Sequence, residues 1–240
     1  MQALRGLDLD IQAGTITALI GPNGAGKTTA FACISGGLRP NAGRVVFGGQ
    51  DITAWPADQI ARAGLVRTFQ LARGISRLSV LDNLLLYAQH LPGEGPAAAL
   101  FGFGQRAEQR ALDRAWTVAE RLNLLAVANQ PAAALSGGQK KLLEIGRALM
   151  AGPRLILLDE PIAGVNPALA ETIAEHLRTL RAEGTTFVVI EHHMDLIARL
   201  CDPVIVMAGG ARLTEGSFAE VAADPAVQDA YMGQRHRSAC

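Results

Sequence analysis

TITALIGPNGAGKTT, residues 15–29, is the stretch that decides the fold. Its first six residues are mostly apolar and predict a buried strand, and its last residues predict the start of a helix. The loop between them fits the pattern G-x-x-x-x-G-K-T, with Gly21, Gly26, Lys27 and Thr28 at the defining positions. A strand, a glycine-rich loop and a helix in this order are the context that a phosphate-binding loop requires.

Each residue type in this loop has a physical reason to be there. Glycine lets the backbone wrap around phosphate groups, while a row of N–H groups and the helix N-terminus supply positive potential. Lys27 would neutralise the β- and γ-phosphate oxygens, and Thr28 would offer its hydroxyl to Mg²⁺. The residues expected to line this site are Gly21, Pro22, Asn23, Gly24, Ala25, Gly26, Lys27, Thr28 and Thr29.

A second apolar strand ends in two carboxylates. LILLDEP, residues 155–161, places Asp159 and Glu160 at the end of that strand. Beside a phosphate site, Asp159 would hold Mg²⁺ through water, and Glu160 would orient or deprotonate the attacking water. The alternative is a pair of solvated loop carboxylates.

Two further polar residues follow apolar strands. His192 comes after TTFVVIE and could contact a γ-phosphate as a hydrogen-bond donor, or it could be a surface residue beside His193. Gln70 ends the strand LVRTF, where its amide could bind Mg²⁺ or the attacking water, or could be ordinary polar surface. No other ligand cluster accompanies the His-His pair, so a metal site there is the weaker interpretation.

LSGGQKKLLEIGRALM contains a second glycine-rich helix start. Ser136 can cap the helix, Gly137 and Gly138 carry no side chains at the approach, and Leu142, Ile145 and Leu149 mark one buried stripe. The positive end of the helix therefore points toward something anionic, unless this is simply a capped helix.

Composition excludes several classes of protein. Among 240 residues, hydrophobic types make up 49% and charged types 18%, which indicates a globular chain. Lys+Arg and Asp+Glu both number 22, so no basic surface predicts nucleic acid as a partner. No apolar run is long enough to span a bilayer, and three scattered cysteines (Cys33, Cys201 and Cys240) are expected to be reduced thiols.

Alternating strands and helices predict an α/β fold with a parallel sheet covered on both faces, and short strands near residues 44–53 and 203–216 predict a small antiparallel part. Residues 7–11 (LDLDI) are also predicted to be a strand, because apolar and polar residues alternate there. Residues 1–71 and 151–240 should form this core, and residues 72–150 an inserted helical subdomain. Within that insertion, 91–105 is predicted to be a flexible connection.

Two smaller predictions concern helix packing and the chain end. Leu112, Trp116, Ala119 and Leu122 are expected to lie on one face of a helix. The tail QRHRSAC, residues 234–240, is expected to be disordered.

The ordered set GPNGAGKTT, Gln70, LSGGQ, LILLDEP and EHHM resembles the nucleotide-binding subunit of an ATP-binding cassette (ABC) transporter over nearly the whole chain. The resemblance implies a P-loop NTPase fold with a RecA-like core, and an ATPase that binds ATP and Mg²⁺. It also explains the two phosphate grips, because in this family a head-to-tail dimer encloses each ATP between the phosphate loop of one subunit and the signature segment of its partner.

The resemblance implies a role for each matching residue. The expected catalytic residues are Glu160 as base, His192 as switch histidine and Gln70 as the Q-loop glutamine. The expected metal ligands are Thr28, Gln70 and Asp159. The signature residues expected to contact the ATP of the other subunit are Ser136, Gly137, Gly138 and Gln139. In AGVN, residues 163–166, Asn166 stands where many cassettes have aspartate, which puts that cross-dimer contact in doubt.

The finer resemblance is to the ATPases of branched-chain amino-acid importers, through QDITAWPADQIARAGLVRTFQ, AGVNP, EHHMDLI and DPAVQDAYMG. It implies transmembrane permease subunits, an identical or paralogous second ATPase, an indirectly coupled solute-binding protein, and a soluble chain peripheral to the cytoplasmic face of the inner membrane. Urea or amide importers, lipopolysaccharide exporters and soluble ABC-type regulatory proteins are the alternatives.

One departure from the family concerns adenine. Cassettes usually stack adenine on an aromatic residue before the phosphate loop, whereas the first aromatic residue here is Phe31. Alignment with the family places its first strand and this aromatic residue a few positions before residue 1, so we expect both to be missing here, either because the start was placed too late or because the sequence differs. We expect weaker nucleotide binding than a longer version would show.

Overall fold

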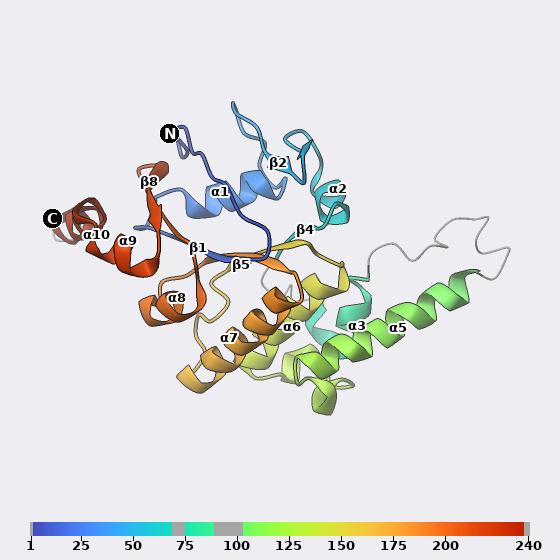
Figure 1. Cartoon of the computed structure of the whole chain (residues 1–240). Helices are drawn as coiled ribbons and strands as arrows, with labels where there is room; N and C mark the ends of the chain where they lie inside the picture. The colour runs from blue at the N-terminus through green and yellow to red at the C-terminus, as the bar shows by residue number, and fades with distance from the viewer. Residues whose placement is uncertain (1, 69–74, 89–102, 238–240) are drawn as a thin grey trace. The chain divides into compact units, whose positions relative to one another are not determined.

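Runs of apolar residues form the strands of a six-stranded sheet in the computed structural model, which describes residues 2–68, 75–88 and 103–237 (Figure 1). The strands are β1 (Ile16–Ile20), β4 (Leu65–Arg67), β5 (Leu155–Asp159), β6 (Thr186–Ile190), β7 (Val204–Ala208) and β8 (Ala211–Gly216). Their order across the sheet is β4-β5-β6-β1-β7-β8, and every pair is parallel except the β7–β8 hairpin. The predicted α/β class with a parallel core is confirmed.

Both faces of the central strands are buried, as the continuous apolar strands predicted, whereas the edge strand β8 contains no buried residue. All five residues of β1 and all five of β6 are buried. One face forms a core with α1 (Lys27–Ile34), whose Phe31 is fully buried. Figure 1 shows α1 on one side of the sheet and α8 (Met194–Leu200) on the other.

Strand register decides which chain segments meet at the carboxyl edge of this sheet. Asp159, the last residue of β5, pairs with Ile190, the last residue of β6. In β1, Ala18 pairs with Val189 of β6, so the loop after Ile20 leaves from the same edge. The phosphate loop and the polar residues after β5 and β6 therefore emerge together.

The chain forms two compact units. The first comprises Met1–Arg67, Arg154–Pro161 and Leu177–Cys240, and the second comprises Thr68–Pro153 and Ile162–His176. Besides the sheet, α1 and α8, the first contains α2 (Ala57–Arg62), α9 (Phe218–Ala223), α10 (Pro225–Arg237) and the antiparallel pair β2 (Val46–Phe47) and β3 (Gln50–Asp51). The proposal that residues 72–150 act as a signature subdomain remains a prediction.

Helices make up the second unit. They are α3 (Val80–Leu85), α5 (Phe103–Arg121) and α6 (Gly137–Met150), with 3-10 turns η1 (Ile75–Arg77), η2 (Leu125–Val127) and η3 (Ala132–Ala134) and the start of α7 (Pro167–Ala182). Ser79 and Asp82 form the capping box expected at the start of α3. Leu142, Ile145 and Leu149 are buried on α6, as predicted. None of the helices within the described ranges is long and apolar enough to cross a bilayer.

The prediction of a strand at residues 7–11 was wrong. No strand is assigned among the described residues before Ile16. The alternation does have a structural meaning, because Leu7, Leu9 and Ile11 are half-buried against the core. It specifies which side chains face inward and not whether the backbone pairs with a neighbour.

Other boundaries also differ from the sequence predictions. Helix α5 begins at Phe103, inside the segment predicted to be flexible, of which residues 91–102 lie outside the described residues. Helix α10 continues to Arg237, so residues 234–237 of the tail predicted to be disordered are helical, and residues 238–240 lie outside the described residues. Of the residues predicted to lie on one face of α5, Ala119 and Leu122 are buried, whereas Trp116 is exposed. The other buried residues of this helix are Ala107, Ala111, Ala115 and Val118.

The buried thiol of Cys201 predicts how stability depends on pH. Burial, with a smaller contribution from Glu191, raises the pKa of Cys201 to about 12, from 9.0. Above pH 9 the unfolded state loses the thiol proton while the folded state keeps it, and this difference favours unfolding. The protein therefore keeps its full free energy of unfolding below pH 9 and loses part of it as the pH rises toward 12. Between pH 8 and 10.5, the wild type should lose about 2 kcal/mol more of its free energy of unfolding than Cys201→Ala. Urea unfolding at both pH values checks this, and identical losses in the two proteins would contradict it.

Candidate functional site

The backbone of the phosphate loop adopts conformations that require glycine. Gly21 has φ +144°, and a Cβ atom there would lie 2.0 Å from the carbonyl oxygen of Met207 in β7. Only a residue without a side chain can therefore connect β1 to the loop. The loop ends at Lys27, the first residue of α1, which is the helix start that the motif predicted.

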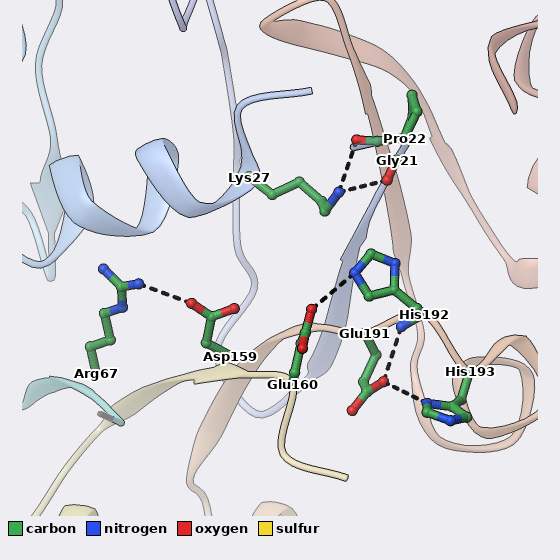
Figure 2. A network of polar contacts seen from close by, with 9 residues as sticks. All are labelled: Gly21, Pro22, Lys27, Arg67, Asp159, Glu160, Glu191, His192 and His193. Carbon is green, nitrogen blue, oxygen red and sulfur yellow. Dashed lines mark hydrogen bonds and ion pairs between the residues drawn. The ribbon is translucent and has the colours of Figure 1, made fainter. Parts of the chain in front are cut away.

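Lys27 is held by the loop itself. Its Nζ donates hydrogen bonds to the carbonyl oxygens of Gly21 (2.6 Å) and Pro22 (3.1 Å), and its side chain is buried (Figure 2). Burial lowers the pKa of Lys27, whereas the charges of Glu160 and Asp159 raise it. This ammonium group can donate to phosphate oxygens in place of the two carbonyl oxygens, because phosphate is negatively charged and accepts stronger hydrogen bonds.

Glu160 lies one residue beyond β5 in a left-handed conformation, φ +50°, which is uncommon for a residue with a side chain. Its backbone N–H donates to the carbonyl of Ile190 and so holds this conformation against β6. Its Oε1 lies 3.1 Å from Nε2 of His192, as Figure 2 shows. Both side chains are nearly half exposed, so the pair is accessible to water and to a ligand.

Glu191, which directly precedes His192 in the chain, was not identified from the sequence. Its side chain is 2% exposed and accepts from the backbone N–H of His192 at 3.0 Å. It also contacts Nδ1 of His193 at 3.1 Å (Figure 2). A buried carboxylate with these two contacts fixes the backbone that carries His192. Its position directly after an apolar strand could have identified it, because the same pattern led to the prediction of Asp159 and Glu160 as site residues.

Arg67 is the second residue that sequence reasoning missed. It is the last residue of β4, and its Nη2 donates to Oδ2 of Asp159 at 2.9 Å. Figure 2 shows the guanidinium facing this carboxylate. A charged residue at the end of an otherwise apolar strand was the signal that could have identified it.

The donor set for a metal ion fits magnesium. Thr28 is exposed on the first turn of α1, and the Asp159 side chain is 28% exposed at the end of β5. Within the described ranges, no group of three histidine, cysteine, aspartate or glutamate residues could hold a metal by itself. Mg²⁺ typically binds one or two carboxylates together with water and substrate phosphates, so a hydroxyl and one carboxylate suit it.

The signature segment, Leu135–Gln139, belongs to the second unit. A capping box begins helix α6: Oε1 of Gln139 accepts from the backbone N–H of Ser136 at 2.9 Å, and Oγ of Ser136 accepts from the backbone N–H of Gln139 at 3.3 Å. Gly138 packs against Leu169, whose side chain would collide with any Cβ atom there, while Gly137 faces open space. The expected cap is confirmed, and the close packing of Gly138 is an additional reason for glycine at that position.

Asn166 begins helix α7 in the same unit. Its Oδ1 accepts from the backbone N–H of Leu169 at 2.9 Å, a helix cap that an aspartate would also provide.

The structure brings Lys27, Asp159, Glu160 and His192 together in the first unit, at the carboxyl edge of the sheet. Gln70, predicted to join them, lies outside the described residues. The roles of all these residues remain predictions.

Comparison with protein families gives two matches. The model described as "ABC transporter" matches residues 4–163, and the model described as "Branched-chain amino acid ATP-binding cassette transporter" matches residues 211–237. A probable branched-chain amino acid transport ATP-binding protein, LivG, of Methanocaldococcus jannaschii is 40% identical over 97% of this chain and 92% of its own. A high-affinity branched-chain amino acid transport ATP-binding protein of Escherichia coli, also LivG, is 37% identical with the same coverage.

Solved structures agree with the observed fold. A nucleotide-free ATP-binding cassette from an ABC transporter has a TM-score of 0.84 and 40% identity, over 95% of this chain and 92% of its own. A dimeric cassette in a post-hydrolysis state, bound to ADP and phosphate, has a TM-score of 0.74 and 26% identity over 90% of both chains.

Proposed function

This chain belongs to the ABC transporter family of ATP-binding cassettes, and we propose that it is the subunit that hydrolyses ATP to power the import of branched-chain amino acids. Family membership makes it an ATPase that binds nucleotide. The transported solute is inferred from the names of the similar proteins and from the match of residues 211–237.

The observation that carries the proposed hydrolysis is the pairing of Glu160 and His192 at 3.1 Å, with Lys27 in the same charged cluster. In this proposal Lys27 leaves the carbonyls of Gly21 and Pro22 and binds the β- and γ-phosphates. Glu160 accepts a proton from the attacking water, and the Nε2 atom of His192 is turned toward the same place, where it can donate to a γ-phosphate oxygen. Mg²⁺, held by Thr28, Asp159 and Gln70, would neutralise charge that develops on the phosphates.

A second subunit would complete each ATP site. We propose that Ser136, Gly137, Gly138 and Gln139 contact the ATP bound by the phosphate loop of the partner in a head-to-tail dimer. The N-terminus of α6 offers a positive dipole end to that anion, together with the N–H groups of Gly137 and Gly138, which the capping box of Ser136 and Gln139 does not use. The dimeric cassette with ADP and phosphate supports such a dimer.

The proposed partners follow from the transport role. We propose that the dimer binds transmembrane permease subunits at the cytoplasmic face of the inner membrane, where it lies as a peripheral protein. A solute-binding protein would take part indirectly. The second ATPase would be either identical or a paralogue.

Co-purification of the tagged chain from its native membranes tests this function. We expect to recover two different permease subunits together with a second ATPase. Vesicles containing this complex should take up leucine, isoleucine or valine only with ATP. Recovery of a single permease pair with this ATPase alone, or ATP-dependent uptake of urea instead, would reject the branched-chain assignment. Recovery of no membrane protein would reject the transport role.

A further inference from the structure

Strand register brings Arg67 to the carboxylate expected to interact with Mg²⁺. In the parallel pair β4–β5, Arg67 is opposite Leu157, two residues before Asp159. The side chain therefore needs to reach only along the strand edge to donate to Asp159 Oδ2 at 2.9 Å (Figure 2). The exposed fractions of the two side chains are 13% for Arg67 and 28% for Asp159.

A second contact joins Arg67 to the helix that follows the phosphate loop. The Cζ atom lies 5.8 Å from the ring centroid of Phe31, a fully buried residue of α1. A guanidinium over an aromatic face gains cation–π attraction, and its planar shape suits the ring better than an ammonium does. Arg67 is thus held between the helix that carries Lys27 and Thr28 and the strand that carries Asp159.

The charge of Arg67 has a direct consequence for a cation at Asp159. An ion pair this well shielded from water is stronger than one on an open surface, and it already compensates the negative charge of the carboxylate. A divalent cation that approaches Asp159 meets the repulsion of the guanidinium. ATP brings several negative charges of its own, so a cation that arrives with the nucleotide is compensated where a lone cation is not.

We propose that Arg67 is a positioning residue that competes with Mg²⁺ for the negative charge of Asp159, so that the metal is retained only together with nucleotide. This inference rests on the proposed function, because it assumes that Asp159 interacts with the metal of Mg·ATP. Arg67 fixes the orientation of the carboxylate, which favours catalysis, and it weakens the attraction for the metal. Loss of Arg67 should therefore strengthen metal retention but lower kcat, so the two effects can be measured separately.

Arg67→Met separates them, because methionine keeps much of the packing against Phe31 and removes the charge. Mn²⁺ serves as the probe for magnesium, and its free concentration is followed by electron paramagnetic resonance with a non-hydrolysable ATP analogue present. The Mn²⁺ concentration for half-saturation should fall roughly three- to tenfold in Arg67→Met, since a unit charge a few ångströms away is removed. The kcat at saturating metal should fall on the order of tenfold, because the carboxylate loses its orientation.

Arg62→Met is the matched control. Arg62 lies on α2 in the same unit and pairs with Asp58 at 3.3 Å, but both side chains are more than half exposed. The same change of residue there should alter neither the half-saturating Mn²⁺ concentration nor kcat. Arg67→Lys retains the charge without the planar fork, so its half-saturating concentration should stay within about twofold of wild type while kcat falls. This variant also covers the case in which Arg67→Met does not fold.

The outcomes distinguish this inference from the function on which it rests. A half-saturating Mn²⁺ concentration that rises or stays constant in Arg67→Met would overturn the competition, because a purely structural residue can only weaken metal retention when it is lost. If Arg67→Met does not fold, a several-fold fall of that concentration in Arg67→Lys would overturn it. Absence of Mn·nucleotide binding by the wild type would overturn the proposed function and this inference with it.

Discussion

Glu160→Gln should leave ATP binding intact and lower the rate of ATP hydrolysis at least about 100-fold, which is the low end of what a positioned general base contributes. Glutamine has the shape of glutamate and can still lie beside His192, where the Oε1–Nε2 distance is now 3.1 Å. It has no basic oxygen of comparable strength to accept a proton from water. Steady-state phosphate release measures the loss, and equilibrium binding of a fluorescent ATP analogue measures the retained affinity.

The variant should also accumulate as an ATP-bound dimer, because the closed dimer reopens only after its ATP is hydrolysed. Size-exclusion chromatography with light scattering would detect this dimer. Glu120→Gln provides the control, because Glu120 is an exposed carboxylate on α5 and undergoes the same chemical change. Phosphate release at the wild-type rate in Glu160→Gln would remove Glu160 from the mechanism.

Gly21→Ala should abolish nucleotide binding and destabilise the fold. The added Cβ would lie 2.0 Å from the carbonyl oxygen of Met207, closer than atoms can approach, and the obstacle is backbone in the adjacent strand β7. Either that strand moves or the loop leaves its position. We expect the free energy of unfolding to fall by about 3 kcal/mol or more and ATP affinity to fall at least about 100-fold.

Gly24→Ala is the matched comparison within the same loop. Gly24 also has positive φ, +81°, but a Cβ atom there would meet nothing within 4 Å. It isolates the cost of the backbone conformation, about 1–2 kcal/mol, from the cost of a collision. Equal losses of stability in the two variants, measured by urea unfolding, would show that the approach to Met207 is not what excludes a side chain at Gly21.

Sequence patterns predicted the parts of the molecule where local chemistry and strand topology agree. The phosphate loop needs a strand before it and a helix after it, and both lie where the apolar pattern placed them. Asp159 ends a buried strand and Glu160 follows it. Because parallel strands point their carboxyl ends to one edge of the sheet, the proximity of both residues to Lys27 follows from topology. The capping residue Ser136 was predictable because its partner lies only three residues away.

Features that depend on contacts distant in sequence could not be predicted in the same way. The pairing of Arg67 with Asp159 joins residues 92 positions apart, and only the register of β4 on β5 brings them together. The alternation at residues 7–11 describes burial correctly but cannot supply a neighbouring strand. On α5, helical periodicity grouped Trp116 with Ala119 and Leu122, but only the two smaller residues are buried in the tertiary packing.

The cap of helix α6 bears on how easily a closed dimer could come apart. Ser136 and Gln139 each have a hydrogen-bond partner within their own chain, at 2.9 and 3.3 Å. In the cap both side-chain oxygens accept, whereas toward a phosphate of the neighbouring subunit the hydroxyl of Ser136 and the amide group of Gln139 would donate. The two backbone N–H groups released from the cap could then donate to the same phosphate. Once the phosphate departs, these N–H groups recover their partners in the cap. In the proposed dimer, the signature segment would therefore release the phosphate without leaving these two N–H groups unpaired.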